Sequence, residues 1–206
     1  MRDFLHLLRR PVALLALLAS ALLLGGCASL TDLRATVVTP HPAPQALVGA
    51  KVQVQAAPGN ADSADAYTFQ TAVLDAMTKA GMVPLLATPA PYTARYAYTV
   101  RLDLEATYGP SVWPPPVLLP NGAVYFPGGY GGWGGGMFGW MPPPNYYDRS
   151  LTLEIRDTAT GALIWQSHAT TGGYDRGLAS VAVPLAQAVL RGFPSESGEH
   201  KVLFPR

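Results

Sequence analysis

The stretch LTLEIRDTATGALIW (Leu151–Trp165) carries the clearest structural signal in the 206-residue chain. Apolar and polar residues alternate from Ser150 to Arg156, which is typical of a strand with one buried face. The residues Asp157–Gly161 are turn formers, and a second apolar segment follows over Ala162–Thr170. This part of the sequence therefore predicts a β-hairpin.

Two further strands are predicted upstream of the hairpin. Lys51–Gln55 alternates polar and apolar residues over a short stretch, and Arg95–Tyr108 does so over a longer one. Strict alternation predicts a sheet with one face buried and the other in water. In the longer segment, the residues expected on the buried face are Tyr96, Tyr98, Val100, Leu102, Leu104 and Ala106.

Two helices are predicted from apolar residues at helical spacing. The first includes Phe69 and Met77 on one face and ends at Gly81. The second covers Leu178–Gly192, with Pro184 inside the pattern. It either begins just before that proline or is kinked there, because proline lacks the N–H group that a helix interior requires.

The order of these elements predicts a single small α+β domain. We expect a mostly antiparallel or mixed sheet of about four strands, with both helices packed on one face, in the order β-α-β-long loop-β-β-α. The predicted domain covers residues 46–194 and is interrupted by an insert at 109–147. Residues 195–206 are expected to form a polar tail with a small apolar end.

The N-terminus has the pattern of a bacterial lipoprotein signal. Basic residues precede Val12–Leu24, an uncharged apolar run that is too short to cross the ~30 Å hydrocarbon core of a bilayer. The run ends in Leu24-Gly25-Gly26-Cys27, which resembles the lipobox of such signals. That resemblance implies cleavage between Gly26 and Cys27, and a diacylglycerol and an N-acyl chain on Cys27. The alternative is a free cysteine behind an ordinary signal peptide.

We accordingly predict a signal peptide over residues 1–26, and a lipidated Cys27 with a Pro-rich tether over 27–45. Ala28, rather than Asp, follows the cysteine. By resemblance to lipoprotein sorting in Gram-negative bacteria, this predicts the periplasmic face of the outer membrane. The outer face of the inner membrane is the alternative location.

Composition and charge exclude several classes of protein. A net charge of +1, with only 13% charged residues, argues against a nucleic-acid binder, which needs a basic surface to bind phosphates. A single cysteine excludes an intramolecular disulfide and a Cys-based zinc site.

The insert is unusual because no residue between Glu105 and Asp148 is charged. Two interpretations remain open: a tolerated low-complexity loop, or an interaction surface for glycan rings, the bilayer interface or a protein partner. Seven aromatic residues lie between Gly109 and Pro144: Trp113, Tyr125, Phe126, Tyr130, Trp133, Phe138 and Trp140.

The candidates for metal binding and nucleophilic catalysis are few. His41, His168 and His200 lack the spacing of a metal site. Ser180, His168 and Asp175 could be grouped as a triad, but the Gly-x-Ser-x-Gly pattern of a nucleophile elbow is missing. His168 is therefore expected to be a surface residue of a strand.

Asp103 and Glu105 share a face of the longer predicted strand, as a pair of catalytic carboxylates could. Arg101 lies beside them, which favours a solvated charge network over acid–base catalysis. We therefore expect no catalytic residue, no metal, no cofactor beyond the acyl groups on Cys27, and no enzymatic activity.

Four segments together resemble the proteobacterial lipoproteins grouped as domain of unknown function 4136. They are the lipobox, the helix end Met77–Gly81, the hairpin Leu151–Trp165 and the helix end Ala188–Pro194. The resemblance covers about residues 46–194. It implies a small α+β domain on a lipid anchor, with no established catalytic residues.

These observations predict a non-enzymatic envelope lipoprotein that acts in envelope organisation through protein or glycan contacts. One alternative is an auxiliary lipid- or glycan-binding component of an envelope transport system, which needs an apolar groove between sheet and helices. Another is an envelope hydrolase that uses Asp103, Glu105 or His168, which needs a pocket that joins those groups.

Overall fold

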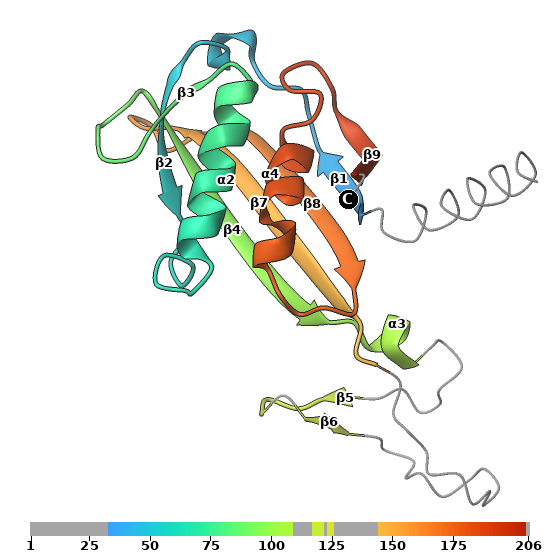
Figure 1. Cartoon of the computed structure of the whole chain (residues 1–206). Helices are drawn as coiled ribbons and strands as arrows, with labels where there is room; N and C mark the ends of the chain where they lie inside the picture. The colour runs from blue at the N-terminus through green and yellow to red at the C-terminus, as the bar shows by residue number, and fades with distance from the viewer. Residues whose placement is uncertain (1–32, 109–116, 122, 126–143, 205–206) are drawn as a thin grey trace, which may run out of the picture. The chain divides into compact units, whose positions relative to one another are not determined.

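The computed structural model describes residues 33–108, 117–121, 123–125 and 144–204. Residues Arg34–Val202 form one compact unit, whose main element is a seven-stranded mixed sheet in the order β3-β2-β4-β7-β8-β1-β9. The helices α2 (Ala66–Lys79) and α4 (Ala182–Val189) lie side by side on one face of this sheet (Figure 1). The strands are β1 (Leu33–Thr39), β2 (Lys51–Ala56), β3 (Val83–Leu85), β4 (Tyr92–Leu102), β7 (Tyr147–Asp157), β8 (Leu163–Gly173) and β9 (Gly198–Phe204).

The predicted hairpin is confirmed as β7 and β8, which pair antiparallel from Tyr147↔Gly173 to Arg156↔Leu163. Gly161 closes the turn at a φ of 73°, in the left-handed region that glycine enters at no steric cost. On the other side, β7 pairs antiparallel with β4 along the full length of both strands. β2 then pairs parallel with β4, so the sheet is mixed.

The prediction of about four strands is wrong, because the sheet has seven. β1 lies in the segment expected to be tether and pairs antiparallel with β8, as at Thr36↔Thr170. β9 lies in the segment expected to be a polar tail, beside β1. Both strands pair with segments remote in sequence, which a local pattern does not reveal. β3 is a further strand, of three residues.

The long strand predicted over Arg95–Tyr108 is also corrected. β4 ends at Leu102, and Leu104–Tyr108 form the short helix α3. Asp103 causes the change of structure, because its Oδ1 accepts a hydrogen bond of 2.9 Å from the N–H of Ala106 at the start of the helix. Apolar residues continue to alternate beyond Asp103, but the hydrogen bond of this cap favours a helix, so the chain does not continue as a strand.

Both predicted helices are present and pack as expected. α2 buries Phe69, Ala72, Val73, Ala76 and Met77. The 3-10 turn η3 (Ala179–Val181) precedes α4, so Pro184 lies in the first turn of that helix, where its missing N–H costs no hydrogen bond. The helix therefore begins just before the proline. A second 3-10 turn, η2, spans Gln45–Leu47.

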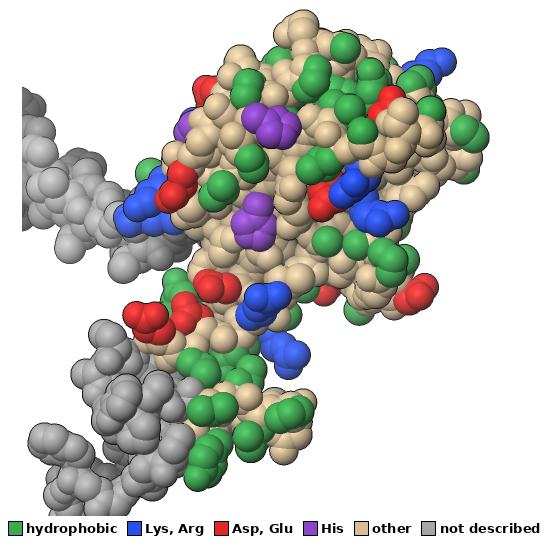
Figure 2. All heavy atoms as spheres, turned by 180° about the vertical axis from the view of Figure 1, so that it is seen from behind, with side chains coloured by type: hydrophobic (Ala, Val, Ile, Leu, Met, Phe, Trp, Pro, Cys, Tyr) green, Lys and Arg blue, Asp and Glu red, His purple; other side chains and the backbone are tan. Residues whose placement is uncertain are grey.

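The two faces of the sheet differ in chemistry. The face under the helices is the core, and its largest fully buried side chains include Tyr96, Leu151, Leu153, Ile155 and Trp165. No described helix covers the opposite face, which Figure 2 shows as a mainly polar surface. Its side chains along the central strands are Thr99 from β4, Ser150 and Thr152 from β7, and Gln166, His168 and Thr170 from β8.

Candidate functional site

Most residues proposed for function from the sequence lie outside the described part of the chain. Cys27 and Gly26 do, as do the aromatic residues Trp113, Phe126, Tyr130, Trp133, Phe138 and Trp140. Tyr125 is described: it lies in β6 (Val124–Tyr125), opposite Val117 of β5 (Val117–Leu118), and is 52% exposed. Among the described residues, no helix is long and apolar enough to cross a membrane.

The structure describes in detail the base of the insert, where the chain leaves β4 and returns to β7. The last pair of these strands is Leu102↔Tyr147. One residue further on, the N–H of Asp103 donates to the carbonyl of Tyr146 at 2.8 Å. The N–H of Tyr146 in turn donates to the hydroxyl of Thr107 at 2.9 Å. The two ends of the insert are therefore held together by hydrogen bonds.

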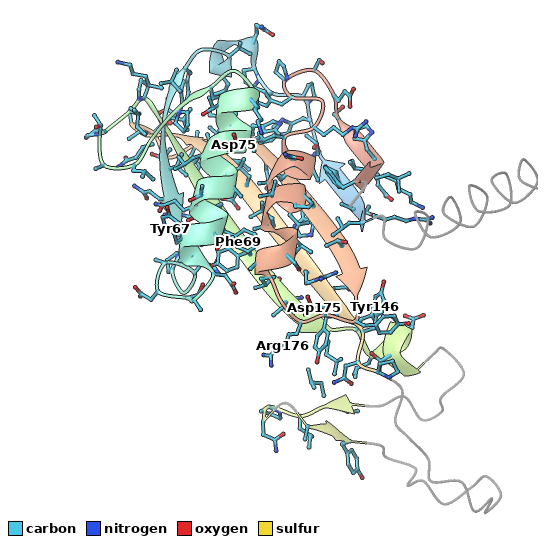
Figure 3. The ribbon with its side chains drawn as sticks, viewed as in Figure 1. Tyr67, Phe69, Asp75, Tyr146, Asp175 and Arg176 are labelled. Atoms are coloured by element: carbon cyan, nitrogen blue, oxygen red, sulfur yellow. The ribbon has the colours of Figure 1, made fainter. Side chains whose placement is uncertain are left out.

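Aromatic packing fixes the returning end. The rings of Tyr146 and Tyr174 meet edge to face, with centroids 5.1 Å apart and planes at 88°. The ring of Tyr146 also lies over Gly172, where any Cβ would overlap it. Figure 3 shows Tyr146 at the same end of the sheet as Asp175. Glycine at position 172 thus allows an aromatic side chain to lie directly on β8.

A buried arginine supports this base from the core side. Arg149 is only 2% exposed, and its Nη2 donates to the carbonyl of Gly172 at 2.9 Å. Gly173 leaves the space that the guanidinium occupies, because a Cβ there would lie 2.5 Å from Nη2. Next to it, burial and then the charge of Asp103 raise the pKa of Asp148, while the charge of Arg149 lowers it.

The proposed Ser180–His168–Asp175 triad is not assembled. Ser180 Oγ lies 3.5 Å from Asp175 Oδ2. His168, however, projects from the open face of the sheet, and its Nδ1 and Nε2 are each 2.8 Å from the hydroxyls of Thr152 and Thr170. Ser180 belongs to η3, which leads into the helix on the other face. A proton relay from Ser180 to His168 therefore has no path.

The other sequence candidates are also separated. Asp103 caps α3 and Glu105 is exposed within that helix, so the two do not share a strand face. His41 lies in an exposed loop and His200 in β9. In the described ranges, no group of three or more His, Cys, Asp or Glu side chains could hold a metal ion.

A shallow hollow of about 260 Å³ lies between α2 and α4. This volume is below the ~300–1,000 Å³ of ordinary ligand pockets. The hollow also opens between the helices rather than between sheet and helices, where a transport component would need its groove. It is lined by Ala76, Lys79, Ala80, Gln187, Leu190 and Phe193.

The environment of His168 predicts a pH-dependent stability. Burial lowers its pKa below the ordinary value of 6.5. The unfolded chain therefore binds a proton on this imidazole at higher pH than the folded chain does. The contribution of His168 to the free energy of unfolding is fully present above about pH 6.5 and is lost as the pH falls below that value. In His168→Gln, the loss of melting temperature between about pH 7 and pH 5 should be smaller than in the parent chain. His41→Gln, in an exposed loop, is the matched control, and equal losses in His168→Gln and the parent would contradict the prediction.

Sequence reasoning missed the residues that close the base of the insert. Tyr146, Arg149 and Gly172 are brought together by the register of three strands, which no local pattern shows. The pair Gly172-Gly173 at the end of a strand was the one available signal, because glycine inside a strand often marks close approach of another group.

A family model described as a domain of unknown function (DUF4136) matches residues 44–195. Among solved structures, the chain is similar to the PelC dodecamer from Paraburkholderia phytofirmans, with 16% identity and a TM-score of 0.45, over 79% of this chain and 99% of that one. It is also similar to a PDZ domain protein from Parabacteroides distasonis ATCC 8503, with 9% identity and a TM-score of 0.47, over 82% of this chain and 38% of that one. No curated protein matches the chain.

Proposed function

The chain belongs to the DUF4136 family, and from this premise we propose that it is a non-enzymatic, lipid-anchored envelope protein whose domain presents the insert to a protein or glycan partner. The observation that carries the proposal is the closed base of the insert. Hydrogen bonds join Asp103, Thr107 and Tyr146 at the end of two fully paired strands. Such a base holds both ends of a segment in place whatever the segment binds.

The composition of the insert supports an interaction role. Its lack of charge lowers the cost of bringing it against an apolar or aromatic surface, and its aromatic side chains are of the kind that stack on sugar rings or fill pockets on proteins. Of the seven aromatic residues between Gly109 and Pro144, the structure describes Tyr125, which is 52% exposed. His168 lies on the opposite side of the sheet from Ser180, and Asp103 and Glu105 do not share a strand face. This arrangement supports binding rather than hydrolysis as the role.

Loss of the anchor is the first test of the proposal. Cys27→Ala removes the thiol that the lipobox would present for acylation, so incorporation of radiolabelled fatty acid should be abolished and the chain should leave the membrane fraction. Ser29→Ala, two residues beyond, is the matched control and should behave as the parent chain. Firm membrane association of Cys27→Ala would contradict the lipid anchor.

Deletion of residues 112–143 tests the role of the insert. The base residues Asp103, Thr107 and Tyr146 remain, so the melting temperature should stay within a few degrees of the parent value. In-cell cross-linking followed by mass spectrometry should then lose the partners found with the intact chain, or purified sacculi should no longer be bound if the partner is a glycan. If the deletion changes neither the cross-linked partners nor the binding to sacculi, the insert is a tolerated loop and the proposed interaction role is wrong.

A further inference from the structure

The described sheet ends in two unlike edge strands. β3 has three residues and contains Pro84, which cannot donate a main-chain hydrogen bond. β9 has seven residues and no proline, and no strand in the described part of the chain pairs with its outer edge. An edge of this second kind can accept a further strand through main-chain hydrogen bonds.

We propose that β9 pairs antiparallel with β9 of a second copy of this chain, about a two-fold axis that makes the two sheets continuous. Two-fold pairing is the commonest symmetry of protein assemblies, and it sets the same surface of each copy against the other. Opposed residues in an antiparallel pair point to the same face of the sheet. The two-fold axis leaves each residue on the same face of the sheet in both copies, so two opposed residues must be an even number of positions apart in sequence. Every symmetric register of β9 is therefore centred on one residue, which lies opposite its own copy.

The charges of β9 select one of these registers. Glu199 and Lys201 are exposed on the open face, whereas Val202 is buried on the core side and His200 is half-buried. A register centred on His200 sets Glu199 opposite Lys201 of the second copy, and does so twice. A register centred on Glu199 or on Lys201 opposes two like charges, which destabilises a strand pair.

Alternating charge on an edge strand has a second interpretation, since exposed lysines also protect edges against aggregation. Protection requires only that charge is present. The spacing of two residues between Glu199 and Lys201, with opposite signs, makes β9 complementary to itself in the His200 register alone. Pro84 blocks β3, so the same chain exposes one edge for pairing and closes the other.

Disulfide trapping in the full-length chain, expressed in the envelope, tests the register. In His200→Cys, the two introduced thiols face each other across the axis at a separation that a disulfide can span, so a covalent dimer should form. In Lys201→Cys, the thiols are offset along the strands and should cross-link at least about fivefold less. The parent chain on the same non-reducing gel gives the background from Cys27.

Charge reversal tests the cause of the pairing. In the His200→Cys background, Lys201→Glu should lower the dimer yield about fivefold, and adding Glu199→Lys should restore it, because the pairs are then opposite in sign again. Both residues are exposed, so the protease resistance of the folded domain should be unchanged. Absence of the His200→Cys dimer, equal or stronger cross-linking in Lys201→Cys, or a yield indifferent to charge would each overturn the proposal.

Discussion

Phe69→Ala is expected to lower the free energy of unfolding by about 4 kcal/mol. Phe69 is fully buried on the inner side of α2, and its ring stacks on that of Tyr98, with centroids 4.0 Å apart and planes at 8°. Tyr98 is itself held by its hydroxyl, which donates to the carbonyl of Asn60 at 2.9 Å. Truncation of Phe69 leaves a cavity against a side chain that cannot move to fill it. Chemical denaturation at a fixed pH measures the change.

Tyr67→Ala is the matched control for this measurement. It removes an aromatic side chain from the same helix two residues away, but Tyr67 is 78% exposed and points away from the sheet (Figure 3). Its free energy of unfolding should stay within about 0.5 kcal/mol of the parent value. Equal losses in Phe69→Ala and Tyr67→Ala would show that α2 does not pack on β4 as described.

Arg149→Ala is expected to cost about 3 kcal/mol and to loosen the base of the insert. The substitution removes a hydrogen bond from a charged group to the carbonyl of Gly172 and leaves a void under Gly173. Hydrogen exchange should accelerate at Tyr146 and Tyr174, which lie on the same end of β7 and β8. Denaturation and exchange measured together separate a local opening from a loss of the whole fold.

Arg156→Ala provides the comparison within the same strand. Arg156 forms an ion pair with Glu154 at 2.9 Å, but its side chain is 41% exposed, so its loss should cost no more than about 1 kcal/mol. Exchange at the base of the insert should not change. A cost for Arg149→Ala that is no larger than that for Arg156→Ala would contradict the role assigned to the buried guanidinium.

The sequence was sufficient to predict those helices and strands whose pattern lies within their own residues. The hairpin β7–β8 follows from alternation on both sides of a turn, and α2 follows from apolar spacing that stops at Gly81. For α4, the sequence left two alternatives, a helix that begins just before Pro184 or one kinked there, and the structure selects the first. In each case the residues that determine the element are its own residues and their neighbours in the chain.

The sequence was not sufficient where the partner is remote. β1 is stabilised by β8, more than a hundred residues away, and β9 by β1. Neither segment has a pattern that shows where it would pair, so both were predicted as appendages. The prediction of a strand over the residues of α3 was wrong for the opposite reason. A local cap at Asp103 starts a helix although the apolar alternation continues beyond it.

The candidate site also has features that the sequence shows and features that depend on remote contacts. A lipobox and an uncharged aromatic insert are visible in the residue types alone, and their roles remain proposals. The closed base depends on Tyr146 lying over Gly172 and Arg149 under Gly173. That arrangement arises from the registers of β4, β7 and β8, which can be described only after the fold is known.

The pairing of β4 with β7 also makes the stability of the domain depend only weakly on the length of the insert. Because the strands on either side are neighbours, the entropy lost in closing the intervening loop rises only with the logarithm of its length, by about 0.6 kcal/mol for each doubling. Segments of other lengths and compositions could therefore be grafted between Thr107 and Tyr146 at little thermodynamic cost. The domain is thus suited to accept a foreign binding loop, and a grafted epitope displayed there would be a direct measure of how far fold and recognition are uncoupled.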